Sequence, residues 1–150
     1  MSQLQHANSF RDLVVYRKAR TVAQRVFQIT KGFPREEMYS LTDQVRRSSR
    51  SVGAQITEAW AKRRYEKHFA SKLSDADGEQ QETQHWIETA TDCDYLKPDD
   101  ARTLNRELGE IGRMLNSMIA KADSFCGAPS FILEESAAEY FVSAEDDGNQ

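Results

Sequence analysis

Residues 101–125 read ARTLNRELGEIGRMLNSMIAKADSF, and the apolar positions in this stretch decide the fold. A spacing of alternately three and four residues places such positions on one face of an α-helix. A regular seam of this kind is typical of helices that pack side by side in a left-handed bundle. The seam consists of Ala101, Leu104, Leu108, Ile111, Leu115, Met118, Ala122 and Phe125.

Three earlier segments carry seams with the same period, and short connections between them favour antiparallel neighbours. The sequence therefore predicts an all-α protein, an antiparallel up-down-up-down four-helix bundle over residues 1–126. The three seams are Val15, Ala19, Val22, Val26, Ile29 and Phe33; Met38, Leu41, Val45, Ser48 or Ser49, Val52, Ile56 and Ala59; and Phe69, Leu73, Ala76, Gln80, Thr83, Ile87 and Ala90.

Helix ends are marked unevenly along the chain. Asn8 or Ser9 is a plausible N-cap for the first helix, with Asp12 in its first turn. Gly32-Phe33-Pro34 ends that helix, and Lys97-Pro98-Asp99-Asp100 opens the fourth. Residues 61–66 contain no Gly or Pro, so the sequence does not place the boundary between the second and third helices.

Charge is distributed unevenly along the 150 residues, although the net charge is only −4. Residues 46–72 hold eight basic side chains and two acids, whereas residues 75–100 hold nine acids and one lysine. Residues 127–150 form a separate acidic tail with six acids and no Lys or Arg, which we expect to be partly docked and partly disordered. Such asymmetry favours an electrostatic partner.

Residues 44–67 read QVRRSSRSVGAQITEAWAKRRYEK. The main functional question is whether their basic side chains bind nucleic acid or serve assembly. On a continuous helix, Arg46, Gly53, Trp60 and Lys67 share one heptad position. Arg and Lys neutralise phosphates, and Trp can stack on a base. The candidate nucleic-acid contacts are Arg46, Arg47, Arg50, Lys62, Arg63, Arg64 and Lys67. The same arginines could instead serve assembly by pairing with acids of a neighbouring helix or subunit, so both readings stay open.

Polar residues interrupt the seam of the third helix at Gln80 and Thr83, with Trp86 beside them. Buried polar groups need hydrogen-bond partners. A subunit interface would supply them, so we expect a homo-oligomer in which Trp60, Gln80, Thr83 and Trp86 lie between subunits.

Signals for catalysis or metal binding are absent from the sequence. There is no GxSxG, P-loop, GxGxxG or HExxH motif. Glu82 and His85 have the Glu-x-x-His spacing of half a di-iron site, but no second copy exists. Cys93 and Cys126 lack zinc spacing and are expected to be free thiols, buried or half-buried. We therefore expect no enzyme, no catalytic residues, no metal, no cofactor and no small-molecule substrate.

The chain's start lacks a secretory signal, and no apolar run is long enough to span a bilayer. The sequence thus predicts a cytoplasmic protein with no membrane partner.

Several motifs in order resemble a known family. They are Phe10-Arg-Asp-Leu13 with Tyr16 and Ala19; Phe33-Pro34 with Glu37, Tyr39 and Leu41; Gln44-x-Arg46-Arg47-x-x-x-Ser51-Val52 with Gln55-Ile56-Thr57-Glu58-Ala59; and Glu82-Thr83 with Trp86 and Tyr95-Leu96. Together they are similar to the four-helix bundle proteins encoded in intervening sequences of bacterial 23S ribosomal RNA genes. The accessory proteins of diversity-generating retroelements look like relatives of that group.

The resemblance spans roughly residues 10–125 and implies a fold, an assembly and a partner. Family members form ring-shaped homopentamers of antiparallel bundles, and the retroelement relatives bind nucleic acid through a basic surface. We therefore expect a non-enzymatic homo-oligomer, a pentamer by resemblance, with RNA or DNA as a possible partner. The alternative is a protein-interaction scaffold that binds no nucleic acid, in which the acidic tail and its aromatic residues recruit a partner or regulate the basic face.

Overall fold

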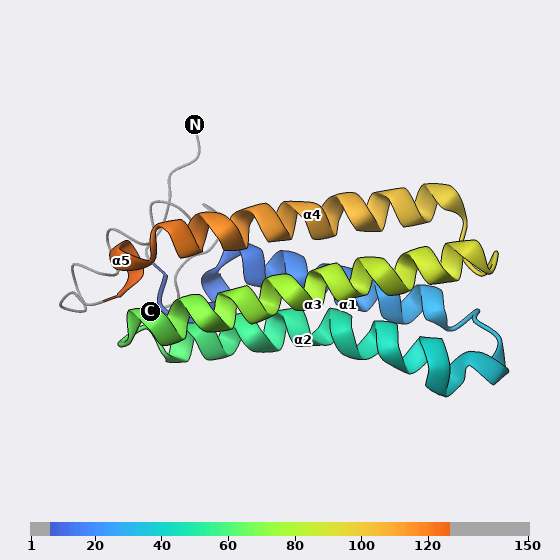
Figure 1. Cartoon of the computed structure of the whole chain (residues 1–150), viewed down its shortest axis with the longest axis horizontal. Coiled ribbons are helices and arrows are strands. Elements are labelled where there is room, and N and C mark those ends of the chain that lie inside the picture. Colours follow the sequence, from blue (N-terminus) through green and yellow to red (C-terminus); the bar gives the residue numbers. More distant parts are fainter. Residues whose placement is uncertain (1–6, 127–150) are drawn as a thin grey trace.

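The computed structural model describes residues 7–126, and the expected acidic tail lies outside this range. All regular elements within the described range are helical, as the sequence predicts (Figure 1). They are η1 (Phe10–Asp12), α1 (Val14–Thr30), η2 (Arg35–Glu37), the π-helix η3 (Met38–Thr42), α2 (Asp43–Ala61), α3 (Glu66–Asp92), α4 (Pro98–Ala120) and α5 (Ala122–Phe125).

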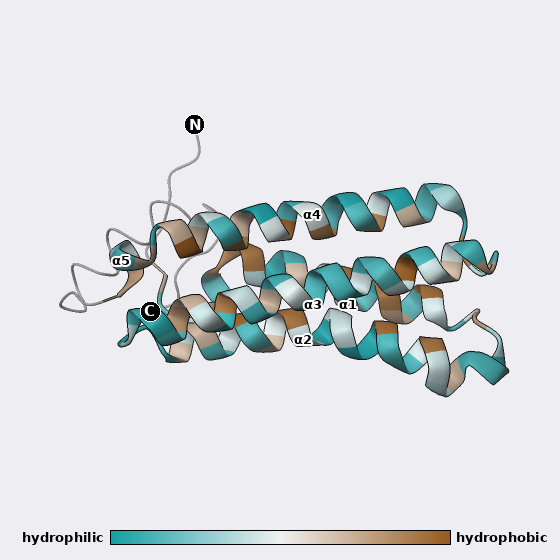
Figure 2. Ribbon diagram, viewed as in Figure 1, coloured by the Kyte–Doolittle hydropathy of each residue, from teal (hydrophilic) through white to brown (hydrophobic). Residues whose placement is uncertain are grey.

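The four long helices lie side by side, and each runs back along the one before it (Figure 1). Helix α2 packs against both α1 and α3, α3 packs against α4, and α4 makes a looser contact with α1. Each long helix carries hydrophobic and hydrophilic residues in turn along its length (Figure 2). The predicted seams form one core: of their apolar members, only Ile29, Phe33 and Met38 are not buried.

The predicted N-cap residue, Ser9, caps a shorter helix than expected. Ser9 Oγ accepts a hydrogen bond from the Arg11 amide at 3.1 Å, and the Asp12 carboxylate accepts from the Asn8 and Ser9 amides. This capping box belongs to η1. Leu13 is extended and separates η1 from α1, so the prediction that the cap opens the first long helix is wrong.

A short turn connects the second and third helices. Helix α2 ends at Ala61, and Tyr65 is extended before α3 begins at Glu66. Residues 62–65 therefore interrupt the helix, and Lys67 lies on α3 rather than on a continuation of α2. The single heptad stripe from Arg46 to Lys67 that a continuous helix would give does not exist.

The fourth seam extends past the end of its helix. Helix α4 ends at Ala120, and the seam continues in the single turn of α5, where Ala122 and Phe125 are buried. The Phe125 ring stacks on Phe69 of α3 at 5.3 Å between centroids. This contact holds the end of the described chain beside the first turn of α3, at the same end of the bundle as the α2–α3 corner (Figure 1).

A membrane-spanning segment would need a long helix made almost entirely of apolar residues. None of the helices between residues 7 and 126 meets that requirement.

Candidate nucleic-acid interface

Three cations gather around the ring of Phe27 where α1 and α2 lie together. The Lys31 ammonium is 4.8 Å from the ring centroid, and the guanidinium carbons of Arg46 and Arg50 are 4.9 and 5.3 Å away. Lys31 follows Phe27 by one helical turn, and Arg50 follows Arg46 by one turn of α2. Cation–π attraction to the half-buried ring stabilises each cation, while their mutual repulsion opposes the gathering.

Arg46 is held in place by the buried side chain of Thr30. Its Nε donates a hydrogen bond to Thr30 Oγ1 at 2.7 Å, and that oxygen lies 2.8 Å from the carbonyl oxygen of Val26. Among residues 7–126, the terminal guanidinium nitrogens of Arg46 have no hydrogen-bond partner. The side chain is therefore positioned by its Nε, and its two terminal nitrogens remain available to an anion.

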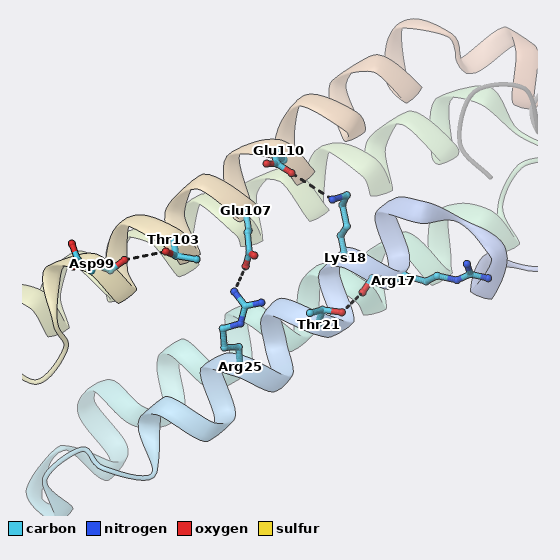
Figure 3. Close-up of polar contacts among 8 residues, drawn as sticks. All are labelled: Arg17, Lys18, Thr21, Arg25, Asp99, Thr103, Glu107 and Glu110. Carbon is cyan, nitrogen blue, oxygen red and sulfur yellow. Dashed lines mark hydrogen bonds and ion pairs between the residues drawn. The ribbon is translucent and has the colours of Figure 1, made fainter. Parts of the chain in front are cut away.

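Cations on the opposite side of α1 form ion pairs with acids of α4. Lys18 forms an ion pair with Glu110 of α4 at 3.4 Å, and Arg25 pairs with Glu107 (Figure 3). These two pairs bridge the looser contact between α1 and α4. The cations around Phe27 have no such acids: within the described part of the chain, neither Lys31 nor the arginines of α2 form an ion pair.

A groove of about 580 Å³ runs between α1 and α2 beside these cations. Arg20 and Arg50 line it, and small residues including Ala23 and Ala54 form its walls. Gly53 is buried, and a Cβ added to it would lie 3.6 Å from Tyr16 Cε1. That distance is an ordinary van der Waals contact, so the packing of Tyr16 from α1 does not require a glycine at this position.

Arg47 is also on α2, but it interacts with residues other than Phe27. Its Nη2 donates to Gln44 Oε1 at 3.2 Å, and it acts on Glu79 of α3. Burial raises the pKa of the Glu79 carboxyl, and Arg47 opposes that rise. Tyr39, which is 83% exposed, lines the same outer hollow as Arg46, Arg47 and Arg50. We call these three arginines the α2 arginine face.

The remaining candidates form a separate group at the α2–α3 turn, which we call the basic corner: Lys62, Arg63, Arg64 and Lys67. Lys62, Arg64 and Lys67 are exposed. Within residues 7–126, none of these three forms an ion pair. Arg63 lies over the Trp60 ring at 3.7 Å, and its Nη1 donates to the Trp60 carbonyl oxygen. One face of Trp60 is therefore occupied by Arg63, so a base could stack there only if Arg63 moved.

Gln80 and Thr83 find their partners inside the single chain. Gln80 is 4% exposed, with Nε2 donating to Asp77 Oδ1 and Oε1 accepting from Gln84. Thr83 is fully buried, with Oγ1 2.8 Å from Ser48 Oγ. The reason for placing these two residues between subunits therefore does not hold, since neither needs a second chain for its hydrogen bonds.

The tryptophans predicted at an interface are half-buried. Trp86 packs against the core and donates its Nε1 hydrogen bond to Glu82 at 3.0 Å, while its ring meets His85 edge-on. Trp60 packs against the core beneath Arg63. Their interface role stays a prediction.

Side chains with reactive or metal-binding groups are scattered. Among residues 7–126, no three His, Cys, Asp or Glu side chains converge in a way that could hold a metal ion. Cys93 is exposed, contrary to the expectation of a buried or half-buried thiol. Cys126 is buried, and its burial raises the pKa of the thiol to about 11.

Sequence reasoning missed Phe27, Lys31 and Arg20 as parts of the basic surface. Phe27 and Lys31 are one helical turn apart, which is a detectable local signal for a shared helix face. Their meeting with Arg46 and Arg50 depends on how α1 packs against α2. That packing has no signature in the sequence of either helix alone.

The fold and the site together define a class: an all-α bundle with a cationic seam between its first two helices. The family model described as 23S rRNA-intervening sequence protein matches residues 11–117, and the chain belongs to this family. A crystal structure of a protein with unknown function from the S23 ribosomal protein family of Bacteroides thetaiotaomicron VPI-5482 is similar, with a TM-score of 0.66 and 30% identity. The match covers 71% of this chain and 96% of that one. A comparison with curated proteins gives no match.

Proposed function

We propose that this protein is a non-enzymatic, cytoplasmic accessory protein that assembles with copies of itself and binds RNA or DNA. Family membership supports assembly, and the sequence resemblance extends this to a ring-shaped homopentamer. The relationship to the retroelement accessory proteins belongs to the same proposal. The α2 arginine face and Lys31 contact phosphates, and the basic corner extends the contact along the molecule.

One observation carries the nucleic-acid part of this proposal: within residues 7–126, Lys31, Arg46 and Arg50 form no ion pair, whereas Lys18 and Arg25 pair with acids of α4. Clustered cations without counter-charges attract the phosphates of a nucleic acid and release its condensed counterions. Arg46 and Lys62 are 16 residues apart on α2 and its end, about 24 Å at helical rise. That distance is roughly seven base pairs of a duplex at about 3.4 Å per step.

The test compares two variants with the same change in charge. Arg46→Gln, Arg47→Gln and Arg50→Gln together remove three charges from the α2 arginine face. The control removes three from α4 through Arg102→Gln, Arg106→Gln and Arg113→Gln, all exposed. Binding of a structured RNA and a DNA duplex should fall at least tenfold in the first variant and much less in the second. An equal fall in both would mean that net charge, and not this surface, governs binding.

A protein-interaction scaffold is the second candidate function. It is favoured by the 83% exposure of Tyr39, because exposed aromatic side chains are common at the centres of protein interfaces. Salt separates the two functions. Phosphate binding weakens steeply as salt rises, whereas an apolar interface is affected little.

A further inference from the structure

The basic corner gathers four cations within six positions of the sequence, at one end of the bundle. Lys62, Arg64 and Lys67 are exposed, and Arg63 rests on Trp60. Tyr65, in the middle of the turn, is 57% exposed. The corner therefore presents both positive charge and an apolar ring to whatever covers it.

The described chain ends beside this corner. Phe125 stacks on Phe69, which follows Tyr65 by one turn at the start of α3. Arg63 and Glu66 both act electrostatically on the Cys126 thiol. The last described residue, Cys126, thus lies next to the basic corner.

The sequence after Cys126 has the complementary composition. It contains six acids and no Lys or Arg, and Glu134, Glu135 and Glu139 flank or follow the apolar residues Phe131, Ile132 and Leu133. Glu134 is eight residues beyond Cys126, so a fully extended chain could carry it at most about 28 Å. A short tether keeps the local concentration of these carboxylates high, in the millimolar range for a flexible chain.

We propose that the acidic segment around residues 131–139 binds the basic corner of its own chain. Its carboxylates pair with Lys62, Arg64 and Lys67, and its aromatic and aliphatic side chains contact Tyr65. The segment would then occupy the corner in the place of phosphates. That consequence for nucleic-acid binding rests on the proposed function, but the contact itself does not.

Zero-length carbodiimide cross-linking of the full-length protein tests this contact, because it joins a carboxylate to an amine only when the two touch. Peptide mass spectrometry should find isopeptide bonds from Glu134, Glu135 or Glu139 to Lys62 or Lys67. The pair Lys72–Glu58, with its atoms 3.2 Å apart, provides an internal positive control. A mixture of isotopically light and heavy chains shows whether each bond lies within one chain.

Two variants sharpen the test. Arg63→Gln with Arg64→Gln lowers the charge of the corner but keeps both lysines, so the cross-link yield should fall severalfold. Neutralising Glu145, Asp146 and Asp147 removes three acids from the far end of the tail and should leave the yield unchanged. Moderate salt should weaken the cross-link as it screens exposed charges.

Several outcomes would overturn the proposal. One is a Lys72–Glu58 bond without any bond from the tail to the corner. Others are tail carboxylates joined to lysines elsewhere, or bonds found only between light and heavy chains. Because the readout contains no nucleic acid, failure of the nucleic-acid proposal would leave this result intact, and the reverse is also true.

Discussion

The contact between Ser48 and Thr83 shows how single polar residues are accommodated in the core. Both are buried, and their hydroxyl oxygens are 2.8 Å apart across the α2–α3 packing. Thr83 Oγ1 is also 2.8 Å from the Glu79 carbonyl oxygen, and Ser48 Oγ is 3.3 Å from that of Val45. Each hydroxyl therefore keeps a backbone acceptor when its partner is removed, and either substitution removes the one hydrogen bond that the two side chains share.

Because either substitution removes the same shared hydrogen bond, replacing both partners should cost less than the sum of the two single replacements. Thr83→Val and Ser48→Ala are each expected to lower the free energy of unfolding by about 1–2 kcal/mol, and the double variant by clearly less than the sum. Urea unfolding at one protein concentration measures all three values. Thr91→Val is the control, since within residues 7–126 the Thr91 hydroxyl bonds only to the Ile87 carbonyl of its own helix. Strictly additive costs would contradict a coupled pair.

Between elements, Tyr95 joins the two connections at one end of the bundle. Its hydroxyl donates to Glu37 Oε2 at 2.8 Å, linking the turn after α3 to η2 between α1 and α2. Its ring also lies 5.7 Å from Phe33. The hydrogen bond to Glu37 is the main reason that the pKa of Tyr95 is raised to about 12.

The sign of the pH dependence follows from this shift. A tyrosine in the unfolded chain titrates near pH 10. The stabilisation from the Tyr95 hydroxyl should be complete below about pH 10 and should disappear as the pH rises through about 12. Ultraviolet titration of the native protein should show one tyrosinate forming near pH 12, and Tyr95→Phe should remove it. Tyr39→Phe, which changes an exposed ring, should retain it; loss of the step in both variants would contradict the assignment.

The elements also show what sequence can predict. The helical interiors follow from apolar periodicity, which needs no knowledge of neighbouring segments. Their ends do not: the extended Leu13 and the turn at residues 62–65 lie in stretches without Gly or Pro. The π-helix η3 before α2 has no clear signal either. These features depend on how adjacent helices pack, so local patterns leave them undetermined.

For the whole molecule, the decisive feature is where its charges are paired. The sequence identified the arginines of α2 but left their role open between assembly and phosphate binding. The structure places Arg46 and Arg50 with Lys31 around Phe27, and none of the three forms an ion pair within residues 7–126. It also separates the basic corner from the α2 arginine face. Both facts depend on tertiary packing.

The most direct test of the central claim is the salt dependence of nucleic-acid binding. The affinity for a DNA duplex is measured from about 50 to 200 mM salt for the wild type and for the triple Gln variant of the α2 arginine face. Each phosphate contact contributes about 0.9 to the slope of log affinity against log salt. The wild type should show a steep negative slope, and the variant a slope shallower by up to about 2.7. Equal slopes, or no wild-type binding at the lowest salt, would contradict the account and leave these arginines a role in assembly.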